Sequence, residues 1–437
     1  MGVSAEPDYD LARFLRTRRL IFTLLALAFM LGYFYRTAPG VMTDSLMSAF
    51  GTGGAALGTL VAIYFYVYTA MQLPAGVLSD RLGPRLSAFS GALLAGLGAV
   101  AFGLAPAFAV AGVGRLLMGL GTSTIFVGLM KANTVWFPEH RYGAVSGLAI
   151  LLGIAGAFIS AGPLALLMSW FTWRSIFVFA GVLALLLAVL ILIFVRNAPE
   201  DAGFPSVREM VGEASYAASD RHWLADIARV LRDHQAWAIF WASFGTGGAF
   251  FGFAGLWGVP LLRDVFGLDR SHAAVYTSVS LIFLAGGALL MGWVSDKVRR
   301  RKPFIVGAAA VSASTWCAML LLPWGPGGSA LLLYSALGLA ASAMTVGYAG
   351  AKEAADPSVS GMSIALVNTG LFLGVAVNQT VFGWLLDLGW NGHIENGVRH
   401  YDFAAYQHGL GFCLGMTVLA LAAASRVRET HARQSAP

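Results

Sequence analysis

Long apolar stretches recur along the chain and are separated by short polar segments. Each stretch is roughly 20 residues long and lacks strict alternation of apolar and polar positions. Membrane β-strands would be about 10 residues long and would alternate, so the pattern predicts helices. The twelve expected spans are 20–43, 56–78, 86–105, 109–135, 143–168, 174–195, 237–261, 272–294, 303–323, 328–351, 359–386 and 404–425. The sequence therefore predicts an all-α integral membrane protein.

The composition agrees with lipid as the solvent. Apolar residues make up 58% of the 437 positions and charged residues only 11%, whereas soluble domains carry about 25% charged residues. The net charge of +6 is spread over loops, so no nucleic-acid partner is expected. Cys317 and Cys413 both fall within apolar spans, which favours neither a disulfide framework nor a metal site.

The longest polar segment divides the expected spans into two sets of six. The predicted organisation is a tail (1–19), a first six-helix bundle (20–195), a central loop (196–236), a second bundle (237–425) and a second tail (426–437). The end of the central loop, from Trp223 to Arg232, has the apolar spacing of a helix lying on a membrane surface.

Basic residues are distributed unevenly between the two ends of the expected spans. With the N-terminus inside, the outer end keeps only four arginines, which are Arg174, Arg263, Arg270 and Arg399. Because basic loops remain in the cytoplasm, this bias predicts that both tails and the central loop are cytoplasmic. The first segment lacks a small-residue cleavage site, so we interpret it as a tail rather than a signal peptide. A bacterial inner membrane is the expected location.

Two polar turns repeat one residue pattern in the two halves of the chain. Each reads glycine, two apolar residues, serine, aspartate and a basic residue. The matching positions are Gly76, Asp80, Arg81, Gly83 and Arg85 in the first half and Gly292, Asp296, Lys297 and Arg301 in the second. The aspartates are about 216 positions apart, close to half of the chain. Repetition at half length in a membrane composition predicts two related helical repeats.

These turns resemble the signature of the major facilitator superfamily, and the resemblance covers the chain from about Arg19 to Arg426. The first turn is similar to the signature between the second and third helices, and the second to its degenerate copy between the eighth and ninth. Arg115 with Gly119 and Gly121 is similar to the fourth-helix arginine motif. The resemblance implies two pseudo-symmetric six-helix bundles that rock about a central site and so give alternating access.

The resemblance also implies a gating role, as a cytoplasmic clamp, for both turns and for the fourth-helix arginine. The residues concerned are Gly76, Asp80, Arg81, Gly83, Arg85, Arg115, Asp296, Lys297 and Arg301. A carboxylate near a helix N-terminus, with arginines in reach, forms charge-assisted bonds that can break again. The alternative is that Asp80 and Arg85 only shape a turn. Arg115 could be a helper or a substrate ligand.

Three cations lie inside the expected spans, namely Arg36, Arg115 and Lys131, and no Asp or Glu lies deep in any span. An intramembrane charge is costly and marks a functional site by default. Unpaired cations need a wet cavity, which would attract anions, so a small anionic organic solute is the expected substrate. The alternatives are a structural Arg36 bonded to backbone carbonyls and a Lys131 that extends to the inner interface.

The segment Tyr33-Phe34-Tyr35-Arg36 resembles the first-helix Tyr-x-Asp-Arg of the anion:cation symporter branch, whose arginine contacts substrate anions. Tyr35 replaces the aspartate, which argues against proton coupling through that carboxylate. Tyr64 and Tyr68 share one helical face, as do Asn368 and Gln379, although such residues can equally be packing. The expected substrate-binding set is Arg36, Tyr33, Tyr64, Tyr68, Lys131, Asn368 and Gln379.

The sequence thus favours a secondary active or facilitative transporter of a small anion, with H⁺ or Na⁺ as the possible coupling ion. The alternatives are an exporter of drug-like amphipathic compounds and a transporter-fold sensor or assembly protein without flux. No catalytic His/Asp/Glu constellation lies within the spans and no nucleotide-binding loop exists, so neither an enzyme nor a cofactor is expected. We expect a monomer whose partners are its solute and membrane lipid.

Overall fold

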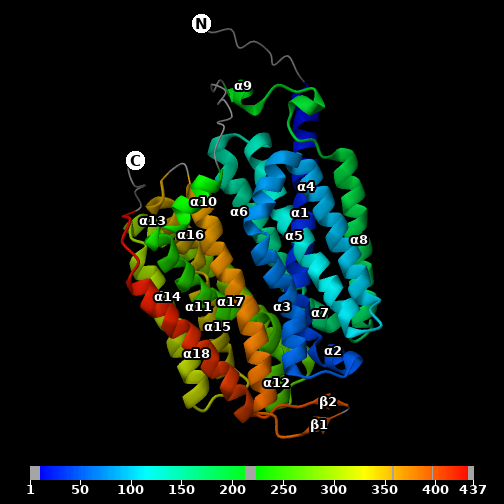
Figure 1. Ribbon diagram of the computed structural model, residues 1–437, viewed down its shortest axis with the longest axis vertical. Helices are drawn as coiled ribbons and strands as arrows, with labels where there is room; N and C mark the ends of the chain where they lie inside the picture. The colour runs from blue at the N-terminus through cyan, green and yellow to red at the C-terminus, as the bar shows by residue number, and fades with distance from the viewer. Residues whose placement is uncertain (1–9, 212–222, 357–358, 396, 432–437) are drawn as a thin grey trace.

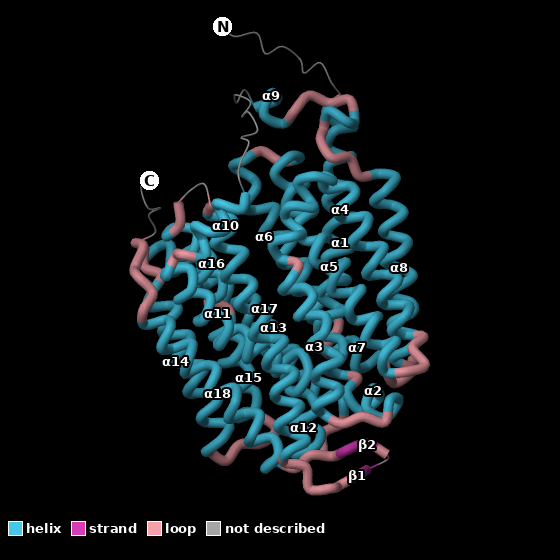
Figure 2. Tube along the Cα trace, in the orientation of Figure 1, coloured by secondary structure: helices cyan, strands magenta, loops and turns pink. Residues whose placement is uncertain are grey.

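The computed structural model describes residues 10–211, 223–356, 359–395 and 397–431 as two helical bundles lying side by side (Figure 1). One end of the molecule carries a short β-hairpin and is called the hairpin end here. Both ends of the described chain lie at the opposite end, which is called the terminal end (Figure 1). Figure 2 shows that helices form nearly all of the regular structure between these two ends.

The first bundle contains nine helical elements. They are α1 (Leu11–Thr37), η1 (Ala38–Val41), α2 (Thr43–Phe50), α3 (Gly54–Ala70), α4 (Gln72–Gly103), α5 (Phe108–Trp136), α6 (Glu139–Ile159), α7 (Gly162–Leu167) and α8 (Trp173–Phe194). Helix α1 begins inside the segment expected to be a tail, because the Asp10 side chain accepts a hydrogen bond from the Arg13 amide (2.9 Å) and caps the helix.

The second and third spans are joined by the first polar turn. Met71 has a helical backbone, and the Ala75 amide donates to its carbonyl (2.8 Å), so α3 continues into the first turns of α4. The chain reverses at Gly83, whose φ of 73° and ψ of 170° interrupt the helix. Residues 54–82 therefore form one span and the remainder of α4 forms the next.

The described part of the segment between the bundles holds three short elements at the terminal end. They are η2 (Glu200–Ala202), α9 (Val207–Val211) and α10 (Trp223–Leu231). Val230 of α10 is buried against Ala355 and Val359, so α10 packs on the terminal end of the second bundle.

The second bundle repeats the six-span plan and adds the hairpin. Its elements are α11 (His234–Gly252), η3 (Phe253–Trp257), α12 (Gly258–Phe266), α13 (Arg270–Val298), α14 (Lys302–Leu321), α15 (Gly328–Ala341), α16 (Met344–Ala354), α17 (Ser360–Leu388), β1 (Ile394–Glu395), β2 (Val398–Arg399) and α18 (Phe403–Ser425). Element η3 is a π-helical turn between α11 and α12. The two strands are antiparallel, with Ile394 opposite Arg399.

Eleven helices among the described residues are long and apolar enough to cross a membrane, and the number rises to twelve when the bent pair α2 and α3 is counted as one span. Large apolar side chains such as Phe179, Leu289 and Leu332 are at least 70% exposed on the outer surface of the bundles. In water such a surface would be unstable, but it suits contact with lipid chains. The predicted all-α membrane fold of twelve spans in two bundles is confirmed.

Candidate functional site

A cavity of about 130 Å³ lies between the two bundles. The first bundle lines it with residues of α1, α3, α5 and α6, which are Phe29, Tyr33, Arg36, Thr37, Phe65, Tyr68, Phe126, Ile150 and Ala157. The second bundle lines it with residues of α11, α16 and α17, which are Phe251, Met344, Thr345, Tyr348, Asn368, Leu371 and Phe372. A ligand held here would contact both halves at once, as alternating access requires.

Arg36 is the one charged residue among the described residues that line this cavity. Only 4% of its surface is exposed, and it makes no ion pair within the described chain. Four aromatic rings surround its guanidinium, with ring centres at 4.5 Å (Tyr33), 4.4 Å (Tyr68), 4.9 Å (Phe372) and 5.9 Å (Tyr64) from its central carbon. Contact with ring faces stabilises a cation without neutralising it, so the positive charge remains available to an anion.

The orientation of Arg36 is fixed from α3. Its Nε donates a hydrogen bond to the Tyr64 hydroxyl (3.1 Å), and that hydroxyl is also paired with Thr122 Oγ1 (2.5 Å) on α5. Tyr64 is fully buried behind Arg36 and does not line the cavity. The structure therefore places Tyr64 as a support for the guanidinium rather than in the cavity wall.

Arg115 lies close to this network but has a different role in the packing. It is fully buried, and its two terminal nitrogens donate to the Tyr35 carbonyl (2.7 Å) and the Val61 carbonyl (2.8 Å). These bonds join α5 to α1 and α3 within the first bundle. Arg115 does not line the cavity, and its hydrogen bonds go to α1 and α3 rather than to either polar turn. Its position therefore does not fit a cytoplasmic clamp.

The predicted substrate-binding residues separate into two groups. Arg36, Tyr33, Tyr68 and Asn368 line the cavity, and the structure brings them together from three helices. Lys131 instead donates to the Ser79 carbonyl (3.0 Å) near the first polar turn. Gln379 is fully buried on the hairpin side of the cavity, where its backbone closely approaches Gly58 of α3. Neither Lys131 nor Gln379 lines the cavity, because each lies too far along its helix.

Sequence reasoning did not select two residues that shape the site, Phe372 and Tyr348. Phe372 lies four positions after Asn368 on α17, so the helical period could have identified it as a neighbour on the same face. The Tyr348 hydroxyl donates to Asn368 Oδ1 (2.7 Å), and Asn368 Nδ2 donates to Gln72 Oε1 (3.1 Å) across the two halves. Nothing in the apolar sequence around Tyr348 indicated this chain of bonds.

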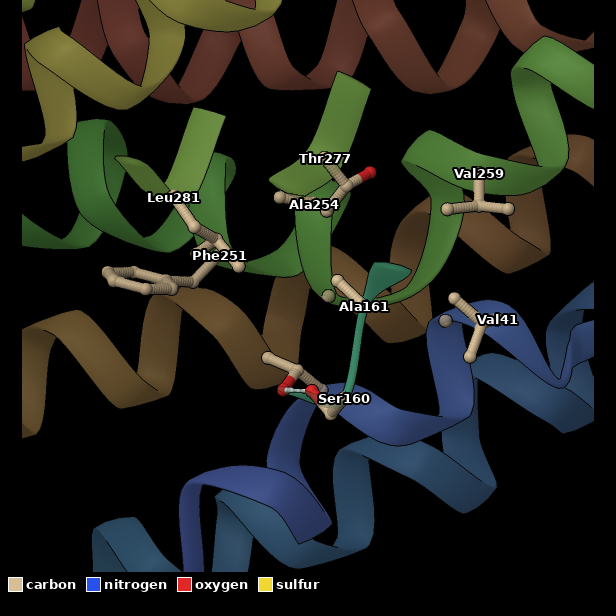
Figure 3. A pocket seen from close by; sticks show the side chains of 11 residues that line it. Val41, Ser160, Ala161, Phe251, Ala254, Val259, Thr277 and Leu281 are labelled. Atoms are coloured by element: carbon tan, nitrogen blue, oxygen red, sulfur yellow. Dashed lines mark hydrogen bonds between the residues drawn. The ribbon is translucent and has the colours of Figure 1, made fainter. Parts of the chain in front are cut away.

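The hairpin side of the cavity is closed by contacts between the halves. Figure 3 shows a narrow slot there, in which Val41, Ser160 and Ala161 of the first half face Phe251, Ala254 and Val259 of the second. Its free volume is about 10 Å³, which is room for about one water molecule and not for a solute. The cavity is therefore sealed on this side.

Two polar contacts hold that seal at the hairpin end. Asp387 of α17 accepts hydrogen bonds from the amides of Gly54 (3.0 Å) and Ala55 (2.9 Å), and so caps α3 of the opposite half. The Tyr401 hydroxyl donates to the same carboxylate (2.6 Å); burial and then Asp387 raise the pKa of Tyr401, so the hydroxyl keeps its proton. The second contact is an ion pair between Asp44 of the first half and Arg263 of the second.

At the terminal end, each polar turn binds within its own half. Arg85 donates to the Leu192 carbonyl of α8 (2.7 Å and 3.0 Å), and its amide donates to Asn197 Oδ1 (3.0 Å). Arg81 is exposed, Gly76 has open space around it, and the side chain of Asp80 lies outside the described residues. Arg85 is thus the residue of this motif whose side-chain bonds anchor the turn among the described ones.

The second turn is held by a buried arginine. Arg301 forms ion pairs with Asp296 (2.6 Å) and Glu353 (2.6 Å), while Lys297 lies 5.1 Å from the ring centre of Trp293. The hydrogen bonds that Arg301 donates to Glu353 raise the pKa of Arg301 above its usual value, against the effect of burial. Arg301 thus joins α13, α14 and α16 at the terminal end of the second half. Glu353 was not among the site residues expected from the sequence.

Two helical bundles, a central cavity with one buried cation, and a closed seal at one end define a membrane transporter of the alternating-access type. The family model described as Major Facilitator Superfamily matches residues 24–378 and, in a second match, residues 258–435. The chain belongs to this superfamily.

Relatives and a solved structure agree with this assignment. The chain is 24% identical over 289 residues to a probable sulfoacetate transporter of Cupriavidus necator, covering 66% of this chain and 67% of the relative. It is 25% identical over 334 residues to a probable L-galactonate transporter of Escherichia coli, covering 71% of each. A bacterial homologue of the human lysosomal transporter Spinster, solved inward-facing and unoccupied, matches with a TM-score of 0.72 and 16% identity over 94% of this chain and 96% of that one.

Proposed function

We propose that this protein is a secondary transporter of small organic anions and that Arg36 binds the anionic group. The observation that supports this most directly is the placement of Arg36, a buried cation without an ion-pair partner among the described residues, in a cavity shared by both halves. Burying an unpaired charge is costly, so such a residue persists where a ligand of opposite charge completes the site. The sulfoacetate and L-galactonate named for the relatives are both organic anions, which supports the proposal.

The size of the cavity favours a small solute over a drug-like one. Sites for drug-sized ligands enclose roughly 300–1,000 Å³. The cavity here has about 130 Å³, and no carboxylate lines it within the described residues. An exporter of amphipathic compounds, which would be marked by an acidic residue in the cavity, therefore fits the geometry less well. The proposed activity moves the solute without converting it.

We further propose that the terminal end faces the cytoplasm of a bacterial cell, with both termini inside. The hairpin end carries Arg263, Arg270 and Arg399, whereas the polar turns and α10 bring most of the basic residues to the terminal end (Figure 1). In this orientation the structure is closed to the outside. A monomer with H⁺ or Na⁺ as the coupling ion is consistent with the two-bundle plan.

The proposal is tested by ligand-dependent stability of the purified protein against small carboxylates, sulfonates and neutral sugars. Arg36→Gln should weaken binding of any stabilising anion by about 10- to 100-fold, because a hydrogen bond to a charged group contributes roughly 1.5–3 kcal/mol. Lys131→Gln is the matched control, since it removes a cation from the same half without touching the cavity. Stabilisation by neutral compounds alone, equal in wild type and Arg36→Gln, would contradict the proposal.

A further inference from the structure

We propose that the transported anion carries a single acidic group on an apolar body about the size of one six-membered ring, rather than a polyhydroxylated chain. This inference rests on the proposed function and specifies its substrate class. It rests on two features of the cavity: which hydrogen-bond donors of its wall are free to bind a ligand, and where in the cavity these donors lie.

Most polar groups in the cavity wall already give their protons to protein acceptors. Thr37 Oγ1 donates to the Tyr33 carbonyl (3.0 Å) and Thr345 Oγ1 to the Ser342 carbonyl (3.0 Å). The Tyr348 hydroxyl and the Asn368 amide are both used in the chain of bonds that ends at Gln72. Using one of the three hydroxyl groups as a donor to a solute would break an existing bond, which costs roughly 1–3 kcal/mol when the acceptor stays buried. The Asn368 amide keeps one N–H beyond its bond to Gln72.

The donors that remain are gathered at one end of the cavity, around Arg36. Nε of Arg36 is taken by Tyr64, and the guanidinium also hydrogen-bonds to the Tyr33 side chain, which leaves most N–H groups of the two terminal nitrogens for a ligand. In the described chain, neither the Tyr33 nor the Tyr68 hydroxyl donates to another residue, and both rings lie within 4.5 Å of the guanidinium carbon. Together these groups form one anion-binding end.

The rest of the wall is apolar and comes from both halves. Phe29 and Phe126 stack with ring centres 5.2 Å apart on the first half, and Met344 and Leu371 line the cavity from the second. An engineered cavity of about 150 Å³ with a similar apolar lining admits benzene. A volume of about 130 Å³ therefore suits one ring, or a chain of similar bulk, beyond the acidic group.

A sugar acid fits this wall poorly for an energetic reason. Each of its hydroxyl groups loses hydrogen bonds to water on entry, and the mostly apolar wall offers only a few hydroxyl and amide groups in return. An apolar body loses no such bonds and gains contact area with the rings and aliphatic side chains. The same wall thus selects against polyhydroxylated anions and for apolar ones.

Binding of three probes to the full-length purified protein tests the inference. The probes are benzoate, gluconate and the neutral analogue benzamide, measured by ligand-dependent stability in wild type, Arg36→Gln and Met344→Gln. We expect benzoate to bind at least about tenfold more tightly than gluconate and benzamide. Arg36→Gln should abolish the advantage of benzoate over benzamide. Met344→Gln places an amide in the apolar wall at nearly constant size, so it should reduce the ratio of benzoate affinity to gluconate affinity. Met344→Leu, which keeps the wall apolar, should leave that ratio unchanged.

The outcomes separate this inference from the proposed function. Tighter binding of gluconate than of benzoate, lost in Arg36→Gln, would overturn the apolar-body inference and leave anion transport standing. Binding of benzamide as tightly as benzoate, in wild type and Arg36→Gln alike, would overturn both. If neither anion stabilises the protein at millimolar concentration, the assigned substrate class is wrong.

Discussion

Arg36 illustrates how a membrane interior can hold a guanidinium ready for a ligand. An arginine stays protonated in proteins, so the site must stabilise the cation without an acid. Aromatic faces do this, at about 0.5–2 kcal/mol for each desolvated contact, and leave the edges of the guanidinium free to donate hydrogen bonds. A neighbouring carboxylate would instead occupy those donors. Tyr35, which stands where the related motif has aspartate, points away and donates to the Ala180 carbonyl (2.9 Å).

Tyr64→Phe should destabilise the protein and weaken anion binding together. The change leaves Nε of Arg36 buried without an acceptor and breaks the bond to Thr122, at a cost of about 1–3 kcal/mol. Thermal unfolding in detergent, with and without the anion, measures both effects. Tyr66→Phe is the control, because Tyr66 is 40% exposed and its hydroxyl has one long contact (3.4 Å) with Thr380. Equal unfolding temperatures for the two variants would contradict this description of Tyr64.

The sequence could indicate Arg36, Tyr33, Tyr68 and Asn368 because charge, aromatic spacing and amides stand out within apolar spans. It could not show how far along its helix each residue lies relative to the cavity. Lys131 and Gln379 carry the same chemical signals, but one lies near the terminal end and the other behind the seal at the hairpin end. Depth in a bundle is set by packing between helices, and one sequence does not encode it locally.

At the scale of elements, Gly83 is the residue that allows two spans to follow each other closely. Its φ of 73° with ψ of 170° is a conformation that is essentially confined to glycine, and a Cβ there would lie 2.5 Å from Asn197 Oδ1. The turn returns the chain so that the third span packs against α8, where Arg85 binds the Leu192 carbonyl. The repeated polar pattern thus has a clear structural role in addition to the expected clamp role.

Gly83→Ala should lower the stability of the first bundle by about 1–3 kcal/mol through backbone strain and the clash with Asn197. Gly76→Ala is the matched control in the same motif, since a Cβ there meets nothing within 4 Å. Chemical or thermal unfolding measures the stability of each variant relative to the wild type. A Gly83→Ala protein as stable as Gly76→Ala would show that this turn relaxes without cost.

The membrane-spanning segments were predictable because a continuous apolar stretch of about 20 residues is a strong signal. The breaks within these helices could not be predicted from the sequence. The π-helical turn Phe253–Trp257 divides the seventh span, and the tenth is divided between α15 and α16. Both breaks lie in helices that contribute residues to the cavity wall or to its seal. Helix α2 was not expected either, and it turns by 110° relative to α3 instead of crossing the membrane.

At the scale of the whole molecule, the two halves are held together mainly at the hairpin end. Asp387 is the central contact, because one carboxylate accepts bonds from two α3 amides, from Tyr401 and from Arg399 (3.1 Å). A negative charge at the N-terminus of a helix is also stabilised by the helix dipole. The bonds from Gly54 and Ala55 cross between the halves, so these two have to break before a solute can enter from this side.

Asp387→Asn should open the hairpin end more often, because an amide accepts fewer of these bonds and carries no charge. Maleimide labelling of Val41→Cys, in a background without Cys317 and Cys413, reports this opening, since Val41 is 3% exposed in the slot of Figure 3. We expect labelling to be several-fold faster in Asp387→Asn. Asp402→Asn is the control, because Asp402 caps α18 within its own half. Unchanged labelling in Asp387→Asn would show that the seal does not depend on this carboxylate.

The most direct measurement of the central claim is counterflow of a radiolabelled organic anion into proteoliposomes preloaded with the same unlabelled anion. Benzoate and gluconate would both be tried, with wild type, Arg36→Gln and Lys131→Gln. The structure predicts saturable counterflow of an anion by wild type and Lys131→Gln, and its loss in Arg36→Gln at equal protein incorporation. Anion counterflow that is as fast in Arg36→Gln as in wild type would contradict the assignment of Arg36 as the anion-binding residue.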